Sequence, residues 1–84
     1  MGTNLLISLQ NAILILNMNP QKIGHNIKNA RKKSGITQAE VAGKAKIHVN
    51  YYARIERGET VPSVEVLEAI SKILKIKSSD ILPF

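Results

Sequence analysis

The sequence predicts an all-α domain of five short helices, preceded by an apolar segment that carries no charge. From residue 20 onward, apolar residues recur three or four positions apart, which is the spacing of one helix face, and no alternating strand pattern is present. Residue types that start or end helices separate these periodic segments at short intervals. At 84 residues the chain fits one small domain, whose limited core a partner subunit would stabilise.

The charge distribution divides the chain into two parts. All 12 Lys and Arg residues and all 6 Asp and Glu residues lie between Lys22 and Asp80. We therefore expect residues 1–19 to form an apolar extension and residues 20–84 to form a helical domain. The apolar stretch of the extension is about twelve residues long, too short for the roughly 20 that cross a membrane. The extension also lacks the basic start of a secretory signal, so we expect no membrane contact.

Two interpretations of the apolar extension remain open. One face of a helix would be lined by Leu5, Leu9, Ala12, Ile13 and Leu16, but residues 13–16 suit a strand equally well. An uncharged apolar segment exposed to water invites association, so we expect it to pack on the domain or on a second subunit. Alternatively, Met18 is the native start and the residues before it are not native.

Apolar stripes, and residues that start or end helices, predict the first two helices of the domain. Residues 21–33 carry the first stripe, and Gly35 is free to adopt the left-handed conformation that ends a helix. Thr37 and Glu40 have the spacing of a capping box, which predicts that the second helix starts there. The residues expected to face the core are Ile23, Ile27, Ala30, Val41, Ala42 and Ala45.

Three further helices follow in the same manner. A break at residues 47–48 precedes a helix over residues 49–57, which Gly58 ends. Ser63 is the expected N-cap of the fourth helix. Residues 78–80 are expected to cap a last short turn. The predicted buried faces consist of Val66, Leu67, Ile70, Ile73 and Leu74, and then Ile81 and Leu82.

Composition restricts the class of partner and of activity. A net charge of +6 attracts polyanions, nucleic acid before an acidic membrane surface. The absence of cysteine excludes disulfides and thiolate zinc sites and agrees with a reducing, cytoplasmic location. His25 and His48 do not make a metal cluster, and no nucleophile–base pair, carboxylate dyad or Gly-rich phosphate loop is recognisable. We therefore expect no metal, no cofactor and no enzymatic activity.

The second and third predicted helices have the geometry of a DNA-reading unit. Two short helices joined by a tight turn present the second helix to the major groove of DNA, which is wide enough for one α-helix. In residues 49–57, Tyr52 and Ile55 lie three positions apart and can anchor this helix. The residues left near its outer face are Val49, Asn50, Tyr51 and Arg54. Asn pairs well with adenine, and Arg with guanine or phosphate.

A set of short motifs occurs in one specific order. The motifs are Ile27-x-x-Ala30-Arg31, Gly35-Ile36-Thr37-Gln38-x-x-Val41-Ala42, Tyr51-x-x-Arg54-Ile55-Glu56-Arg57-Gly58, Pro62-Ser63 and Asp80-Ile81-Leu82. With these motifs, residues 23–82 resemble the phage-repressor (Cro/XRE-like) helix-turn-helix family. The resemblance implies a five-helix, lambda-repressor-like fold and a sequence-specific, double-stranded-DNA-binding transcriptional regulator. It also implies a repressor or autoregulator that acts as a homodimer.

The resemblance assigns roles to individual residues. Gln38 corresponds to a residue that contacts a phosphate, and the residues that would read bases are Val49 and Asn50, followed by Tyr51 and Arg54. Val49 cannot form a side-chain hydrogen bond, so we expect it to touch a thymine methyl group, while Tyr51 is expected to be exposed and able to donate to phosphate. Arg31 and Glu56 would form a structural ion pair between the first helix and the end of the third.

Several positions depart from the family pattern. Lys46 stands where the family usually has Gly, so either the turn relaxes or Lys46 adopts positive φ and offers a cation to phosphate. His48 stands where Ser or Thr is usual; a neutral imidazole is expected to be a poor cap, which leaves capping failure and phosphate contact as alternatives. Gly43 is unusual within a helix. Arg57 would contact phosphate or simply stabilise the helix C-terminus.

A second class of function also remains open. Some proteins with this fold bind another protein, as antitoxins bind toxins. An adaptor of this kind would use the apolar segment before Met18 to bind its protein partner.

Overall fold

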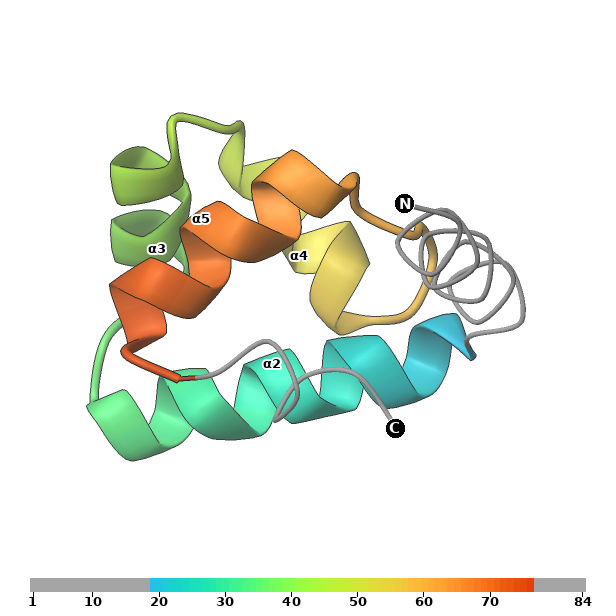
Figure 1. Ribbon diagram of the computed structural model, residues 1–84, viewed down its shortest axis with the longest axis horizontal. Helices are drawn as coiled ribbons and strands as arrows, with labels where there is room; N and C mark the ends of the chain where they lie inside the picture. Colours follow the sequence, from blue (N-terminus) through green and yellow to red (C-terminus); the bar gives the residue numbers. More distant parts are fainter. Residues whose placement is uncertain (1–18, 77–84) are drawn as a thin grey trace, which may run out of the picture.

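The computed structural model describes residues 19–76, which form four helices and no strand. The helices are α2 (Pro20–Ser34), α3 (Gln38–Ala45), α4 (Val49–Glu56) and α5 (Val64–Leu74), as Figure 1 shows. The all-α prediction is confirmed for this part of the chain. The expected fifth helical turn near residues 78–82 and the apolar extension up to residue 18 lie outside the described residues, so both stay predictions.

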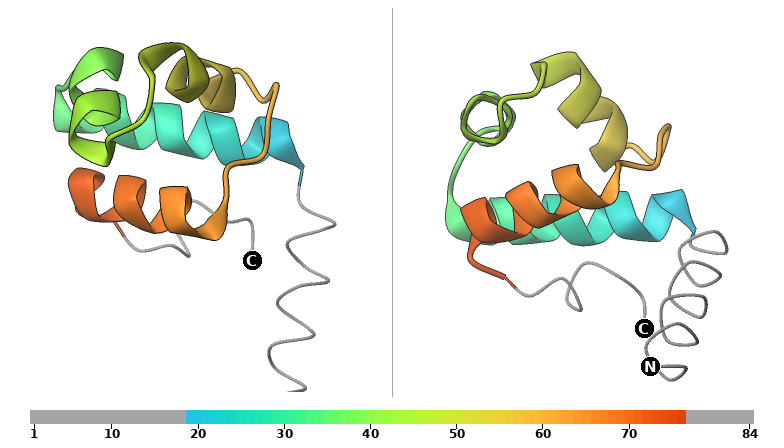
Figure 2. Two further views of the ribbon diagram at one scale, coloured as in Figure 1. Left: turned by 90° about the horizontal axis from the view of Figure 1, so that it is seen from above. Right: turned by 45° about the horizontal axis from the view of Figure 1, so that its top comes forward.

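The longest helix, α2, supports the other three. Both α4 and α5 pack against α2, and α3 packs against α4 and α5 (Figure 1). Both views of Figure 2 place α4 at one edge of the domain, with α2 and α5 on its inner side. One face of α4 is therefore directed away from the other helices.

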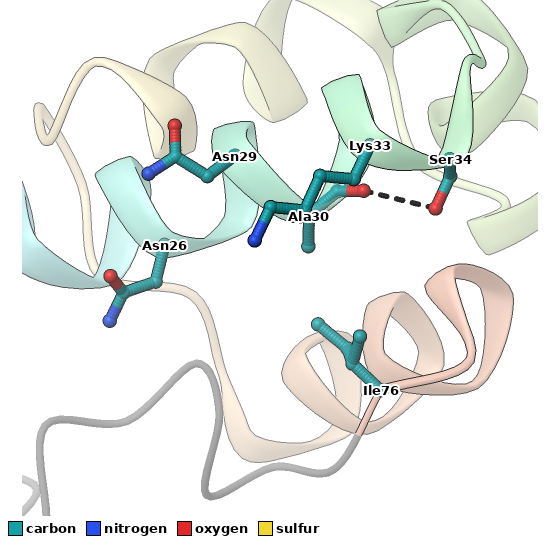
Figure 3. A pocket seen from close by; sticks show the side chains of 6 residues that line it. All are labelled: Asn26, Asn29, Ala30, Lys33, Ser34 and Ile76. Carbon is teal, nitrogen blue, oxygen red and sulfur yellow. Dashed lines mark hydrogen bonds between the residues drawn. The ribbon is translucent and has the colours of Figure 1, made fainter.

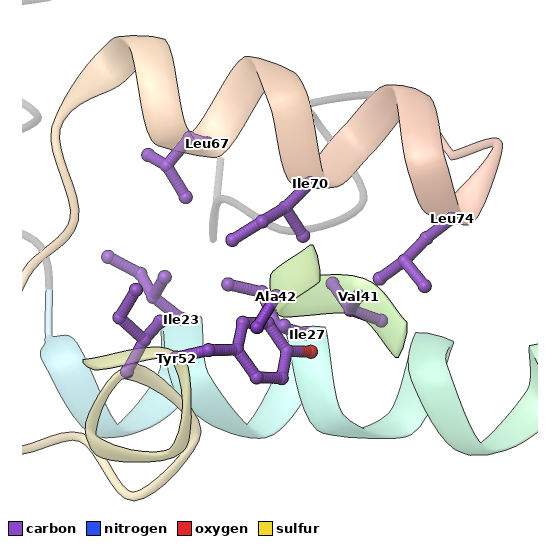
Figure 4. Close-up of a cluster of buried hydrophobic side chains, with 9 residues drawn as sticks. Ile23, Ile27, Val41, Ala42, Tyr52, Leu67, Ile70 and Leu74 are labelled. Carbon is purple, nitrogen blue, oxygen red and sulfur yellow. The ribbon is translucent and has the colours of Figure 1, made fainter. Parts of the chain in front are cut away.

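A single apolar core joins all four helices. Among residues 19–76, most of the residues predicted to face inward are buried, whereas Ala30, Ala45, Val66 and Ile73 are half-buried. Figure 4 shows the cluster, in which α5 lies opposite α2 and the ring of Tyr52 reaches between them. The buried core residues are Ile23, Ile27, Val41, Ala42, Tyr52, Ile55, Leu67, Ile70 and Leu74.

The helix ends follow the capping residues read from the sequence. The Glu40 amide donates to Thr37 Oγ1 at 3.1 Å, and the Glu40 carboxylate accepts from the Thr37 amide at 3.3 Å, which completes the capping box. Ser63 caps α5 by accepting from the Val66 amide at 3.2 Å. Gly35 ends α2 in the left-handed region, with φ of 72°. Residues at the helix ends themselves therefore define these boundaries.

The contact between α2 and α4 depends on a glycine within α2. A Cβ atom at Gly24 would lie 2.3 Å from the carbonyl oxygen of Ile55 and 2.6 Å from that of Glu56. The two backbones thus approach more closely than any side chain would allow. By contrast, nothing lies within 4 Å of a Cβ atom placed at Gly43 in α3.

Alanine at these two glycines is expected to have opposite effects on stability. Gly24→Ala must push the end of α4 away from α2, so we expect it to lower the free energy of unfolding by about 3 kcal/mol. Gly43→Ala is expected to raise it by about 1 kcal/mol, because Ala favours the helix and has free space here. Urea titration of the two variants measures both effects. Equal midpoints for the two variants would contradict the close backbone contact.

Candidate nucleic-acid interface

The turn between α3 and α4 is tight and keeps a left-handed residue. Lys46 has φ of 58° and ψ of 40°, and the Ile47 amide donates to the carbonyl oxygen of Ala42 at 3.0 Å. Ile47 is half-buried against the core, whereas the Lys46 side chain is exposed. Of the two alternatives for this position, relaxation of the turn is wrong. The turn holds its shape, and Lys46 accepts the conformational cost that Gly would avoid.

His48 is the N-cap of α4. Its backbone is extended, with φ of −69° and ψ of 140°, and its Nδ1 accepts a hydrogen bond from the Asn50 amide at 3.0 Å. The expectation that imidazole caps poorly is therefore wrong here, and capping failure does not occur. The physical reason is that Nδ1 carries its lone pair two bonds from Cβ, where Asn carries the oxygen of a normal cap.

Helix α4 has a buried face and an open face. Tyr52, Ile55 and Glu56 are buried, whereas Val49 is 39% exposed, and Asn50 and Arg54 are also exposed. This division agrees with the arrangement expected from the sequence. The open face combines an apolar, an amide and a guanidinium group, which together can contact a base methyl group, a base edge and a phosphate.

Tyr51 is partly buried, and Arg57 is exposed but forms an ion pair. Tyr51 was expected to be exposed, but it is half-buried and packs against the core cluster. Arg57 directly follows α4, and its Nε donates to the Glu59 carboxylate in an ion pair whose side chains are 59% and 50% exposed. An exposed pair of this kind is weak and is screened by salt, so the Arg57 guanidinium can exchange Glu59 for another anion.

Beneath the open face, a buried ion pair ties α4 to α2. Arg31 donates through Nε and Nη2 to the two oxygens of Glu56, at 2.6 and 3.2 Å. The third guanidinium nitrogen, Nη1, donates to the carbonyl oxygen of Ile36 at 3.0 Å. Only 2% of the Glu56 side chain is exposed. The resemblance implies a pair between Arg31 and Glu56. In the structure this pair is bidentate and almost shielded from solvent, which gives it a defined geometry.

Gln38 joins the same carboxylate. It is half-buried at the start of α3, and its Nε2 donates to Glu56 Oε1 at 2.9 Å. One carboxylate therefore binds side chains from α2 and α3 while being part of α4. The phosphate role that the resemblance gives to Gln38 stays a prediction, and the second N–H of its amide is the group that would fulfil it.

The environment of Glu56 determines its charge. Burial by itself raises the pKa of a carboxyl group, but the hydrogen bonds from Arg31 and Gln38 outweigh it, so the pKa of Glu56 lies below its ordinary value. The hydrogen bond to Glu56 raises the pKa of Arg31. Burial, together with the neighbouring Glu56 carboxylate, raises the pKa of Tyr52. Glu56 is thus an anion and Tyr52 a neutral phenol under ordinary conditions.

Two residues near this interface are not predicted from the sequence. Gly24 allows α2 to reach the end of α4, and the only sequence signal is a glycine within an otherwise regular helix. Glu59 pairs with Arg57, and the signal is an opposite charge two positions away in a turn. Both signals are common in sequences, and only the three-dimensional course of the backbone shows that these two residues make the contacts described.

Another surface feature of the described residues lies away from α3 and α4. A hollow of about 440 Å³ is lined by α2 and by Ile76, and by no residue of α3 or α4 (Figure 3). Its side chains are Asn26, Asn29, Ala30, Lys33, Ser34 and Ile76. Within residues 19–76 no group of three or more His, Cys, Asp or Glu side chains could hold a metal ion. No helix among these residues has the length and apolar character needed to cross a bilayer.

The short helix α3, the tight turn and the outward-facing α4 define a helix-turn-helix module. A helix-turn-helix family model matches residues 27–81 of the chain. Since the match covers more than half of the sequence, the chain belongs to this helix-turn-helix family, which confirms the resemblance to the Cro/XRE-like class.

Individual relatives agree with this assignment. The immunity repressor protein of Bacillus phage phi105 is 40% identical over 60 residues, which cover 71% of this chain but only 42% of the repressor. Control protein C.BamHI of Bacillus amyloliquefaciens is 34% identical over 62 residues, 73% of this chain and 76% of that protein. The crystal structure of the clp gene regulator ClgR from C. glutamicum has the same fold, with a TM-score of 0.73 at 24% identity over 79% of this chain and 86% of that chain.

Removing the charge of Glu56 is expected to destabilise the domain far more than removing that of Glu59. Glu56→Gln leaves Arg31 buried without its anion, so we expect a loss of about 3 kcal/mol in the free energy of unfolding at neutral pH. Glu59→Gln breaks only an exposed pair and should cost less than about 1 kcal/mol. Chemical denaturation of both variants measures the difference.

The same variant has a characteristic pH dependence. Because the folded-state pKa of Glu56 is lowered, its contribution to stability is complete above the ordinary carboxyl range and is lost as the pH falls through the folded-state pKa. The stability gap between wild type and Glu56→Gln should therefore shrink as the pH falls below the ordinary carboxyl range. A gap that stays constant with pH would show that the carboxylate charge is not what stabilises the junction.

Proposed function

We propose that this chain is a sequence-specific, double-stranded-DNA-binding transcriptional regulator, a repressor or autoregulator that works as a homodimer in the cytoplasm. The single observation that carries the proposal is the division of α4, which buries Tyr52, Ile55 and Glu56 while Val49, Asn50 and Arg54 remain accessible. A helix held in this way can enter the major groove without disturbing the core.

The open face of α4 supplies the groups for base reading. Asn50 can pair with adenine through its amide, and Val49 can touch a thymine methyl group. Arg54, one turn further along, reaches either guanine or a phosphate. Tyr51 is half-buried beside them, so we assign its hydroxyl to a contact with the DNA backbone and not with a base.

Phosphate contacts would surround the reading helix. Lys46 and His48 are exposed in the turn that precedes α4, Gln38 begins α3, and Arg57 follows α4. A net charge of +6 adds attraction to any duplex, which makes affinity fall as salt rises. Binding, and not catalysis, is the activity that this arrangement supports. The names of the relatives, an immunity repressor and a control protein, agree with regulation.

The dimer is part of the proposal because one α4 reads only a few base pairs. Two copies related by a two-fold axis would place their reading helices about 34 Å apart on a palindromic site. Because the domain is small, a second subunit would also add to its limited buried surface.

Selection of bound sites from a random duplex pool tests the function directly. We expect an enriched palindromic sequence, whose affinity falls steeply between about 50 mM and about 200 mM salt. The mass of the complex reports the number of chains bound. Failure to enrich any sequence over random competitor would overturn the regulator function.

Asn50→Ala is expected to relax base preference at one position of each half-site. The loss of a bidentate contact costs about 1–3 kcal/mol for the preferred base and little for the others. Because Asn50 is exposed, the melting temperature should change little. A uniform loss of affinity over all sequences would contradict direct reading by Asn50.

Lys46 and Lys75 allow an experiment that separates the effect of the left-handed conformation from the effect of the charge at Lys46. Lys46 and Lys75 end α3 and α5 in the same left-handed conformation, with φ of 58° and 56°. Replacing either with Gly should stabilise the domain by about 0.5–1 kcal/mol, because Gly adopts this conformation without steric cost. Only Lys46→Gly should weaken DNA binding and reduce the slope of log affinity against log salt by about 1. Equal slopes for the two variants would place Lys46 away from the DNA backbone.

A further inference from the structure

The N-terminus of α4 is held by a ring nitrogen. The Asn50 amide donates to His48 Nδ1 at 3.0 Å, and the Tyr52 amide donates to the His48 carbonyl oxygen at 3.0 Å. A backbone amide can only donate, so Nδ1 must carry its lone pair. A neutral imidazole has one N–H, which therefore lies on Nε2. A protonated ring has no lone pair and cannot form this cap.

His25 in α2 provides an internal contrast. The side-chain amide nitrogen of Asn29 lies 3.0 Å from His25 Nε2. As this amide group is oriented, its N–H donates and Nε2 accepts, which places the His25 proton on Nδ1. The two histidines thus use different ring nitrogens for these contacts, Nδ1 in His48 and Nε2 in His25.

The tautomer of His48 matters because His48 directly precedes the residues proposed to read bases. Val49 and Asn50, the first two residues of α4, follow it directly, and α4 has only eight residues, so its first turn is about half of the helix. The cap holds the amide of Asn50, and hence the point from which the Asn50 side chain projects. His48 is exposed at the helix end that attracts anions, and Nε2–H is the one donor that its neutral ring has left.

We propose that His48 is a positioning residue for base reading that acts as the neutral Nε2–H tautomer. Nδ1 fixes the first turn of α4 for Val49 and Asn50, while Nε2–H donates to a phosphate oxygen of the DNA backbone. This inference rests on the proposed DNA-binding function. It reverses the simpler expectation of a cationic imidazolium against phosphate, because the cap and the imidazolium exclude one another.

Two isosteric substitutions separate the two nitrogens. Asn places its amide group where His has Nδ1, and Gln places its amide group near the position of Nε2. His48→Asn therefore keeps the cap and removes the outer donor. His48→Gln keeps an outer donor and removes the cap.

The two variants should fail in different ways. For His48→Asn we expect an unchanged melting temperature, unchanged base preference, an affinity about five-fold lower on every duplex, and an unchanged salt slope because no charge is lost. For His48→Gln we expect an unfolding equilibrium constant about five-fold larger and a smaller ratio of specific to random binding. If His48→Gln retains the full ratio, or if His48→Asn shifts the preferred sequence, the positioning role is wrong.

The tautomer itself is measured on the wild-type chain. A long-range proton–nitrogen correlation spectrum at about pH 8, where free imidazole is neutral, should show a protonated Nε2 for His48 in free and DNA-bound protein. His25 in the same spectrum should show a protonated Nδ1. A protonated Nδ1 or an imidazolium at His48 in the complex would overturn the proposal. Sequence preference of the wild type, measured separately, decides whether DNA binding itself is correct.

Discussion

The carboxylate of Glu56 is the interaction on which the rest of this structure depends. It is almost completely buried, accepts two hydrogen bonds from Arg31 in α2 and one from Gln38 in α3, and is itself the last residue of α4. Three helices are therefore oriented by one charged group. Such a group tolerates little displacement, because a buried charge that loses its partners is strongly unfavourable. The ion pair thus defines where the end of α4 lies, whereas apolar packing alone would allow some sliding.

Because α4 is anchored in this way, the side chains on its exposed face also have defined positions. Gly24 lets the backbone of α2 touch the end of α4, so that end is held both by contact and by charge. The beginning of α4 is held by the cap at His48 and by the turn at Lys46. A helix of eight residues fixed at both ends has little freedom, and its outer side chains start from defined points. Preorganisation of this kind lowers the entropic cost of binding a duplex.

Local chemistry explains why much of the fold could be predicted. The capping box at Thr37, the N-cap at Ser63 and the left-handed Gly35 act within a few residues, so their pattern is visible in the sequence. The stripes of apolar residues predicted the core for the same reason. The His48 cap was misjudged because its quality depends on the ring rotamer, and Tyr51 because its burial depends on which helices lie beside α4.

The order of residues alone was sufficient to predict the helices of residues 19–76, their approximate boundaries and the family, and to name candidate residues for reading DNA. These follow from periodicity and capping, which involve neighbours along the chain. Folding decided how those residues are used: that Gln38 binds Glu56, that Arg57 pairs with Glu59, and that Gly24 lies against α4. Such contacts join positions that are distant in sequence or depend on one side-chain rotamer, so only the packed arrangement of helices selects them from many possible pairings.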